Sequence, residues 1–213
     1  MHLPSLKFQY KQDAKFALDI PELLLDGIQI LNIVGNNGSG KSTWAKHLAG
    51  LFHKKNHGIK WQYIPQFAEQ FLFAQTINEQ IKYLFEHDFI REKFASELSD
   101  LALPPNDEFM DFPMALMSGG ELRRIMLAFA FYSHKKHIIL DEPTIGLGLK
   151  ESLVLLNKIN TFSAMGNELI IISHDKTIMD ASQHVCAFEN GTLLYSQSTE
   201  DVKKTSLLDQ FIG

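Results

Sequence analysis

Apolar and polar residues change their spacing along the chain, and each change predicts an element of secondary structure. Leu6 to Tyr10 alternates between the two classes, as a half-buried strand does, and Gln29 to Val34 is a short, mostly apolar strand. Residues 35–40 form a glycine-rich turn, after which Lys41 to Leu51 carries apolar side chains at helical spacing. We therefore expect β structure over residues 1–34, followed by a loop and a helix.

The middle of the chain has a different character. It is rich in phenylalanine and in helix formers, as in Ile77 to Phe85, and it lacks β-branched runs. The pair Pro104-Pro105 interrupts it. These features predict a small helical lobe.

Helices and apolar strands alternate in the last part of the chain. A helix from Gly119 leads to the strand Ile138–Leu140, and a helix near 149–162 leads to the strand Leu169–Ile172. This alternation predicts a largely parallel sheet. The fold class is therefore α/β: one domain over residues 1–213, with a core of residues 1–66 and 134–213 that carries an N-terminal antiparallel β layer, and an inserted helical subdomain of residues 67–133.

The composition narrows the class of protein. The chain has 213 residues, of which 45% are apolar and 21% charged, as in ordinary soluble globular domains. The net charge of −5 argues against a general nucleic-acid binder, so we expect no nucleic-acid partner. The single cysteine, Cys186, excludes an internal disulfide, fits a reducing compartment and lies in a region that we expect to be buried.

No targeting or membrane-spanning pattern is visible. Met1 to Tyr10 lacks a basic stretch followed by an apolar core, and the longest apolar runs have the length of a strand. We therefore expect a cytoplasmic protein, which another chain would have to hold if it acts at a membrane.

The strongest chemical signal is a phosphate-binding loop between the first predicted strand and helix. Its sequence is Gly35-Asn36-Asn37-Gly38-Ser39-Gly40-Lys41-Ser42-Thr43, which matches G-x-x-x-x-G-K-[ST] in the context that this motif requires. Glycines let successive backbone N–H groups converge on a triphosphate, and the helix adds the positive end of its dipole. Lys41 would contact the β- and γ-phosphates, and Ser42 would be a Mg²⁺ ligand.

Two adjacent carboxylates follow an apolar strand. The strand carries Asp141 and Glu142 to its carboxyl end, where ligands bind in open α/β sheets. Asp141 would hold the Mg²⁺ shell, and Glu142 would polarise the attacking water as a general base. An apolar run before Asp-Glu is common by itself. It indicates a catalytic site here because the same chain also has the phosphate-binding loop.

A third element, Ser118-Gly119-Gly120-Glu121, precedes a long amphipathic helix. Its place at a helix N-terminus makes it a second anion site, which one chain needs only if two sites act across a dimer. The alternative is an ordinary helix start, with Ser118 as the cap and Glu121 completing a capping box. Both interpretations can hold together.

Together these residues resemble the nucleotide-binding subunits of ABC transporters, in order and approximate spacing from about residue 6 to residue 196. Met117-Ser118-Gly119-Gly120-Glu121 is similar to the signature of that family. The resemblance implies the ABC ATPase fold with a P-loop NTPase core, ATP and Mg²⁺ as cofactors, and a head-to-tail dimer. ATP would lie between the phosphate loop of one subunit and Ser118-Gly119-Gly120 of the other.

The resemblance assigns roles to three further residues. Gln66 matches the glutamine that joins the two lobes and senses Mg²⁺ and the attacking water. His174 matches the switch histidine that contacts the γ-phosphate. Tyr10, which lies 25 residues before Gly35, stands where the family places an aromatic side chain that stacks on adenine; the alternative is an ordinary strand aromatic.

Three features depart from the family pattern. Gly148 stands where an aspartate usually helps to couple the two sites, so coupling or turnover would be weaker. His137 replaces an apolar residue at the start of the strand before Asp141. Only 77 positions separate Lys41 from Ser118, so the helical lobe would be shorter than usual.

Within the family, the energy-coupling-factor ATPases, which import vitamins and transition-metal ions, are most similar. Residues 66–77, 42–51 and 120–124 carry this similarity. Six phenylalanines of the helical lobe have two interpretations: they form its core, or some of them line a groove for a helix of the membrane partner. They are Phe67, Phe71, Phe73, Phe85, Phe89 and Phe94.

The resemblance therefore implies an ATP-hydrolysing subunit, peripheral on the cytoplasmic face of a membrane, that powers solute transport by closing and opening of the dimer. Its partners would be an integral membrane transporter subunit and a second ATPase, identical or paralogous. Two alternatives stay open. One is a soluble ABC-type ATPase in DNA repair or translation, although the chain has neither a long coiled-coil insertion nor a second cassette. The other is a low-turnover regulatory subunit, which Gly148 favours and the intact Glu142 and His174 oppose.

Overall fold

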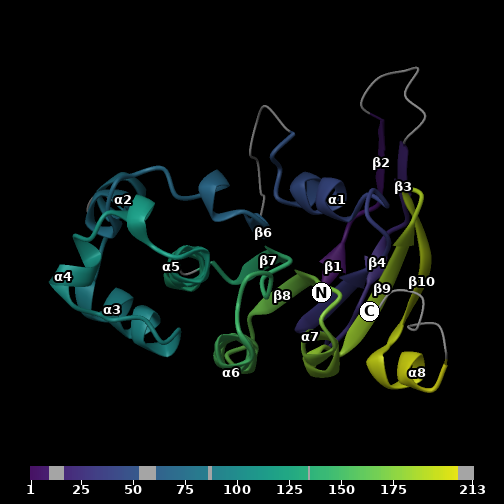
Figure 1. Ribbon diagram of the computed structural model, residues 1–213. Coiled ribbons are helices and arrows are strands. Elements are labelled where there is room, and N and C mark those ends of the chain that lie inside the picture. The colour runs from purple at the N-terminus through teal and green to yellow at the C-terminus, as the bar shows by residue number, and fades with distance from the viewer. Residues whose placement is uncertain (10–16, 53–60, 86–87, 134, 206–213) are drawn as a thin grey trace.

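The computed structural model describes residues 1–9, 17–52, 61–85, 88–133 and 135–205. Most strands form one eight-stranded sheet in the order β2-β3-β10-β9-β5-β8-β7-β6 (Figure 1). In chain order they are β2 Leu6–Gln9, β3 Ala17–Ile20, β5 Ile30–Val34, β6 Trp61–Ile64, β7 His137–Asp141, β8 Glu168–Ile172, β9 His184–Glu189 and β10 Thr192–Ser198. The short strands β1 His2–Leu3 and β4 Leu23–Leu24 pair with each other.

The strands β9, β5, β8, β7 and β6 are parallel, as the alternation of strands and helices predicts. Residues of β5, β7 and β8 are almost all buried, which explains their nearly continuous apolar sequences. Alternate residues of β8 enter two different cores: Leu169 and Ile171 one, Ile170 and Ile172 the other. Both faces of the sheet are therefore covered.

Helices provide the two covering layers. Figure 1 shows α1 (Lys41–Leu48) on one face of the sheet, and α6 (Leu149–Ala164) and α7 (Lys176–Ala181) on the other. The short helix α8 (Thr199–Lys203) packs beside β9 and β10. Cys186 of β9 is fully buried between these layers, as the sequence predicts.

The expected N-terminal β layer is present and is continuous with the main sheet. β2 and β3 are antiparallel, with Leu6 opposite Ile20. β3 joins β10 through the parallel pair Asp19 and Thr192, and β10 runs antiparallel to β9. The eight strands thus form one mixed sheet, whose antiparallel part lies at one edge.

Residues 68–132 hold helices and, within the part of the chain that the structure describes, no strand. The helices are η1 Ala68–Gln70, α2 Ile77–Phe85, α3 Arg91–Asp100, α4 Asp107–Met110, η2 Met114–Leu116 and α5 Gly119–Tyr132. Figure 1 shows α2, α3 and α4 as a group beside the sheet, with α5 between this group and β7. The boundaries of a helical subdomain at residues 67 and 133 stay a prediction.

Four of the six phenylalanines belong to the core of these helices. Phe94 is fully buried, and its ring centroid lies 4.7 Å from that of Phe129. The four are Phe71, Phe85, Phe89 and Phe94. Phe67 and Phe73, by contrast, are 53% and 65% exposed, so the core interpretation holds for four of the six.

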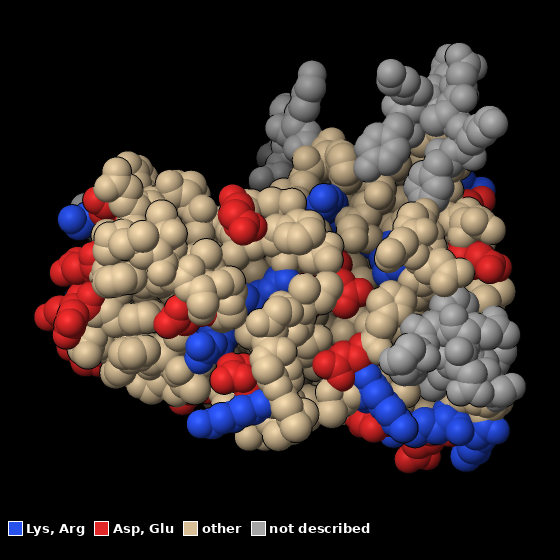
Figure 2. Space-filling model, viewed as in Figure 1, with Lys and Arg blue, Asp and Glu red and all other residues tan. Residues whose placement is uncertain are grey.

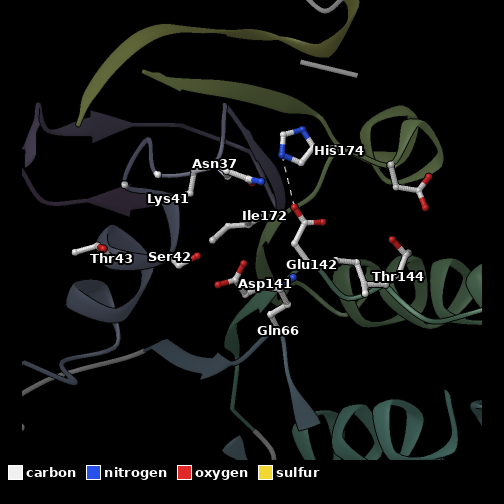
Figure 3. A pocket seen from close by; sticks show the side chains of 14 residues that line it. Asn37, Lys41, Ser42, Thr43, Gln66, Asp141, Glu142, Thr144, Ile172 and His174 are labelled. Atoms are coloured by element: carbon white, nitrogen blue, oxygen red, sulfur yellow. Dashed lines mark ion pairs between the residues drawn. The ribbon is translucent and has the colours of Figure 1, made fainter. Parts of the chain in front are cut away.

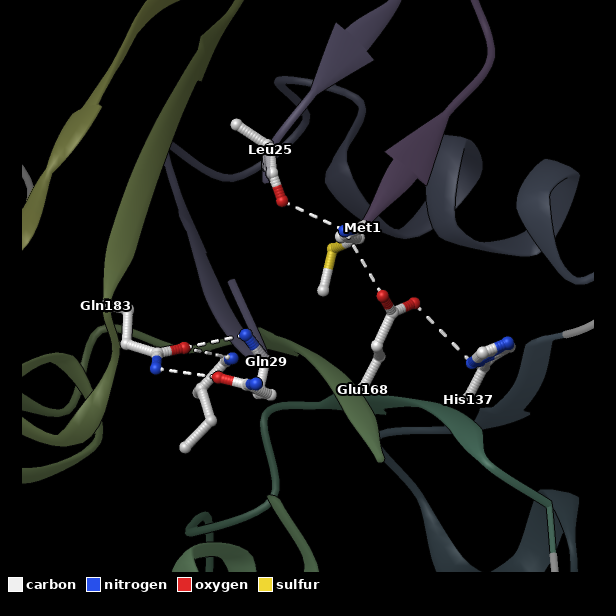
Figure 4. Close-up of polar contacts among 7 residues, drawn as sticks. Met1, Leu25, Gln29, His137, Glu168 and Gln183 are labelled. Carbon is white, nitrogen blue, oxygen red and sulfur yellow. Dashed lines mark hydrogen bonds and ion pairs between the residues drawn. The ribbon is translucent and has the colours of Figure 1, made fainter. Parts of the chain in front are cut away.

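Polar side chains fix the amino ends of the central strands (Figure 4). The Gln183 side chain accepts a hydrogen bond of 2.7 Å from the backbone N–H of Gln29. Glu168, at the start of β8, pairs with His137 at 3.5 Å and with the Met1 amine at 3.2 Å. The pair with Glu168 explains why a polar residue, His137, can open β7. These contacts lie at the amino ends of the strands, so the carboxyl ends of the same strands are available to bind a ligand.

Charged side chains are unevenly distributed on the face shown in Figure 2. Lys and Arg gather at the lower right, near α7 and α8, whereas Asp and Glu gather at the left, over α3 and α4. Within the described ranges, no helix is both long enough and apolar enough to cross a membrane.

Candidate functional site

A cavity of about 730 Å³ opens where β7 and β8 end and α1 begins (Figure 3). Parallel strands bring their carboxyl ends to one edge of a sheet, which is where α/β proteins bind ligands. The glycine-rich loop, the acidic pair at the end of β7 and a histidine after β8 all meet at this cavity. Its lining consists of Asn37, Gly38, Gly40, Lys41, Ser42, Thr43, Gln66, Asp141, Glu142, Thr144, Ile145, Ile172, His174 and Asp175.

The loop of residues 35–40 requires glycine at both ends. Gly35 has a φ of 145°, and a Cβ there would lie 2.2 Å from the carbonyl oxygen of Phe188. Gly40, just before α1, is left-handed with a φ of 104°. The Ser39 hydroxyl is buried and has no hydrogen-bond partner among the described residues. An unsatisfied polar group in a loop that begins a helix suits an anion.

Lys41 is a buried cation at the start of α1. Its ammonium group donates to the carbonyl oxygens of Gly35 and Asn36, the second at 3.0 Å. Burial lowers the pKa of Lys41, and the charges of Glu142 and Asp141 oppose that shift. Burial has removed the hydration of this ammonium group, and its present hydrogen-bond partners are neutral carbonyl oxygens. A phosphate in the cavity would provide a negative charge that compensates for the lost hydration.

Asp141, at the end of β7, is buried and held by a tyrosine. Its Oδ2 accepts a hydrogen bond of 2.6 Å from the Tyr63 hydroxyl of β6. Burial raises the pKa of Tyr63, and Asp141 adds to the shift, so the hydroxyl stays a donor. Tyr63 is not among the residues that the sequence singles out. Only the β6–β7 register, in which Tyr63 lies opposite Ile139, brings it next to Asp141.

Glu142 has a left-handed backbone with a φ of 46°, which costs a non-glycine residue about 1–2 kcal/mol. Its N–H donates to the Ile172 carbonyl oxygen at 2.8 Å, which fixes the turn to the end of β8. Pro143 disfavours the right-handed helical conformation in the residue before it. The turn directs the Glu142 side chain toward His174, whose Nε2 lies 3.7 Å from Oε1 (Figure 3).

The surroundings of Glu142 make its carboxylate more basic. Burial raises its pKa and the charge of Asp141 adds to the shift, while His174 and Lys41 oppose it. A carboxylate whose pKa moves toward neutral pH is a better proton acceptor at that pH. The site therefore holds a candidate base beside an imidazole.

Gln66 follows β6 and lines the cavity. One residue earlier, the Pro65 carbonyl oxygen accepts a hydrogen bond of 3.1 Å from Arg123 of α5. Arg123 is only 4% exposed, and burial lowers its pKa against the opposing charges of the acidic pair. The Gln66 segment is thus tied to the helix that begins after Ser118, through an arginine that the sequence does not single out.

Ser118 and Glu121 form a complete capping box at the start of α5. Ser118 Oγ accepts from the Glu121 N–H at 3.3 Å, and Glu121 Oε2 accepts from the Ser118 N–H at 2.8 Å. The bonds from Ser118 lower the pKa of Glu121. None of residues 118–121, all of them described, lines the cavity. A role for this segment across a dimer stays a prediction.

Gly148 precedes α6 with a φ of −74° and a ψ of 170°, a conformation open to any residue, and no side chain caps the helix there. A Cβ at Gly148 would lie 2.6 Å from Oε2 of Glu151, the end of a flexible side chain. An aspartate at this position therefore fits the backbone and would cap α6 once Glu151 turns away.

Other site residues fall outside the prediction or outside the described ranges. Tyr10, expected to stack on adenine, lies outside the described residues. Thr144 and Asp175 line the cavity although the sequence does not single them out. Both follow closely after strand ends, and that position is the signal that identifies them.

The oxygen donors of the cavity suit Mg²⁺. Within the described ranges, there is no group of three or more His, Cys, Asp or Glu side chains that could hold a metal ion by themselves. The cavity instead offers the Ser42 hydroxyl, the Asp141 carboxylate and the Gln66 amide. Mg²⁺ usually binds one or two protein oxygens together with water and substrate phosphates. These residues therefore fit a Mg²⁺ ion that arrives with phosphates.

The chain is similar to known proteins. The family profile described as ABC transporter matches residues 21–145. The chain is 28% identical over 206 residues to the energy-coupling factor transporter ATP-binding protein EcfA2 of Thermotoga maritima, a match that covers 85% of this chain and 75% of that protein. It is 30% identical over 193 residues to the zinc import ATP-binding protein ZnuC of Alkalilimnicola ehrlichii, which covers 85% of this chain and 72% of that protein.

The solved structures agree with the fold. CbiO1 from Clostridium perfringens, part of the ABC transporter complex cbiONQ, superimposes with a TM-score of 0.78 at 19% identity, covering 98% of this chain and 92% of that one. The predicted ABC ATPase fold is thereby confirmed. A further curated relative matches 97% of this chain, which spans about half, 51%, of that relative's length. Because the family profile covers more than half of its 213 residues, this chain belongs to the ABC transporter family of ATP-binding proteins.

Proposed function

We propose that this chain binds Mg–ATP at the strand ends and hydrolyses it, as the motor subunit of a membrane importer of the energy-coupling-factor type. The observation that carries this proposal is the convergence of a phosphate loop, a buried ammonium group, carboxylates, an amide and an imidazole on one cavity. The function rests on the site, and the named relatives support its connection to transport.

The loop would bind the nucleotide. Its backbone N–H groups surround the phosphates, and Lys41 exchanges the carbonyl oxygens of its own loop for β- and γ-phosphate oxygens. Ser42, Gln66 and Asp141 would hold the Mg²⁺ ion that accompanies the phosphates. Mg²⁺, when bound, neutralises charge that develops on the phosphates. Tyr10 would stack on the adenine ring.

The acidic turn would perform the chemistry. Glu142 accepts a proton from water as the water oxygen attacks the γ-phosphorus and the bond to the bridging oxygen of ADP breaks. The raised pKa of Glu142 and its place beside His174 support this role. His174 contacts the γ-phosphate, and Gln66 orients the water.

A second copy or a paralogue would complete the site with Ser118-Gly119-Gly120. Leu116, before this segment, and Leu149, after Gly148, are 71% and 77% exposed. Large apolar side chains of this kind are covered when a partner binds. Their exposure supports a head-to-tail dimer contact that closes with ATP and opens after hydrolysis.

Exposed aromatic side chains support a membrane partner on the helical lobe. Phe73 and Tyr83 are mostly exposed, and their ring centroids lie 5.5 Å apart. Phe67, close to Gln66 in the chain, is exposed as well. Aromatic residues are enriched at protein interfaces. Since the relatives named above serve an energy-coupling factor transporter and zinc import, we propose vitamin or metal-ion uptake.

A second candidate is a regulatory subunit that binds ATP with little turnover. The glycine at 148, which leaves α6 without a side-chain cap, favours it. The relatives named above do not favour a soluble ATPase in DNA repair or translation.

The proposal is tested first by Lys41→Ala. Removing the main cation for the phosphates should abolish tight Mg–ATP binding in titration calorimetry, whereas Lys93→Ala, which removes an exposed lysine of α3, should not. Binding as tight as that of the wild type would show that the loop is not the phosphate site.

The membrane partner is tested by purifying the tagged chain from detergent-solubilised membranes. Recovery of ribosomes or DNA, without an integral membrane protein, would favour the soluble alternative.

A further inference from the structure

We propose that Tyr63 is a positioning residue that orients the Asp141 carboxylate for the metal shell. This inference rests on the proposed function, and it concerns a residue outside all of the motifs described above. The hydroxyl of Tyr63 lies 2.6 Å from Asp141 Oδ2. With Oδ2 engaged, Oδ1 remains for a metal ion, and Figure 3 shows the Asp141 carboxylate in the cavity that Ser42 also lines.

The tyrosine ring is itself held in place. Tyr63 and Asp141 belong to neighbouring parallel strands, and Tyr63 lies opposite Ile139, two residues before Asp141 on the same face of β7. The ring packs against the core beneath α1, and Lys46 of α1 places its ammonium group 5.7 Å from the ring centroid. A donor fixed between a helix and a sheet restricts rotation of the carboxylate that accepts from it.

In the described part of the chain, no second side chain donates a hydrogen bond to Asp141. Among the described residues, the Tyr63 hydroxyl is the one donor that forms a hydrogen bond with the Asp141 carboxylate, which is buried. Groups that hydrogen-bond to metal ligands typically change metal affinity about 10–100-fold when they are removed. A purely structural role, which satisfies a buried carboxylate, would instead appear in stability alone.

The test is Tyr63→Phe, which deletes the hydroxyl and keeps the ring. Mn²⁺ serves as the probe, titrated by electron paramagnetic resonance into the full chain with a non-hydrolysable ATP analogue. We expect Mn²⁺ affinity to fall at least about tenfold, while affinity for the analogue in EDTA stays that of the wild type. The Mg²⁺ concentration for half-maximal ATPase activity should rise, with kcat at saturating Mg²⁺ nearly kept.

The matched control is Tyr195→Phe. Tyr195 is also partly buried, and its hydroxyl has no partner among the described residues, so its loss should leave Mn²⁺ affinity unchanged. Circular dichroism spectra at low temperature and thermal melting curves, both recorded with the analogue, establish that each variant is folded.

Three outcomes overturn the inference or separate it from the proposed function. Unchanged Mn²⁺ affinity in folded Tyr63→Phe overturns it, even with a lower melting temperature. An equal loss of affinity in wild-type and Asp141→Asn backgrounds also overturns it, because Tyr63 would then not act through Asp141. Absence of nucleotide-dependent Mn²⁺ binding in the wild type contradicts the proposed function itself.

Discussion

Replacing Glu142 by glutamine removes the proposed base and keeps the length of the side chain. The left-handed turn depends on backbone contacts, among them the N–H of residue 142 and the Ile172 carbonyl oxygen, so it should keep its shape. The phosphate loop and Lys41 are untouched. We therefore expect ATP to bind as in the wild type and hydrolysis to slow.

The size of the effect follows from what else could accept the proton. A general base contributes about 10²–10⁴ in rate, which is about 3–5 kcal/mol of barrier. The two other carboxylates that line the cavity are engaged, Asp141 by the Tyr63 hydroxyl and Asp175 by the N-terminus of α7. Since neither is free to substitute, we expect the loss to lie in the upper half of that range.

The assay is steady-state phosphate release at saturating Mg–ATP, with sedimentation to detect a trapped ATP-bound dimer. Glu92→Gln, on the exposed side of α3, makes the same change of charge away from the cavity and should be neutral. If Glu142→Gln binds ATP normally and hydrolyses it at a rate close to that of the wild type, the base lies elsewhere and the reasoning is refuted.

Three further predictions concern other sites. Ser118→Arg should leave the ATP affinity of dilute monomer nearly unchanged but block ATP-driven dimerisation in sedimentation; loss of monomer binding would contradict the role across a dimer. Gly148→Asp should raise steady-state ATPase activity or dimer fraction, and a change in neither, or a fall in both, would mark Gly148 as an adaptation. Burial raises the pKa of Cys186 to about 11 from 9.0, so the unfolded thiol ionises first and stability should fall between these pH values. The loss from this thiol is about 3 kcal/mol, since one pKa unit is about 1.4 kcal/mol; urea unfolding should show it, and Cys186→Ala should remove this part of the fall, while the part due to Tyr63, whose pKa burial also raises, should remain.

Local sequence predicts those parts of the site that local structure builds. The apolar runs before Gly35, Asp141 and Ser173 become buried parallel strands, because such strands bury both faces. The glycine-rich loop lies between strand and helix as its motif requires, and Ser118 and Glu121 complete the expected cap.

Contacts between distant segments are what the sequence does not reveal. The bond from Tyr63 to Asp141 spans 78 positions and depends on strand register. The bond from Arg123 to Pro65 spans 58 positions and depends on how α5 packs. The left-handed turn at Glu142 has no compositional signal, because glutamate rarely adopts it. The joining of β2 and β3 to the main sheet likewise follows from pairing with β10.

The buried bond between Arg123 and Pro65 also limits how the molecule can move. This hydrogen bond connects α5, which starts at the proposed dimer face, to the segment that carries Gln66 into the cavity. If the helical lobe rotates while the hydrogen bond stays formed, Pro65 must move with the lobe. If the hydrogen bond breaks, the buried Pro65 carbonyl and the buried Arg123 guanidinium lose this partner, which costs about 1–3 kcal/mol. This bond therefore favours states in which the helical lobe and the Gln66 segment move together over states in which they move apart.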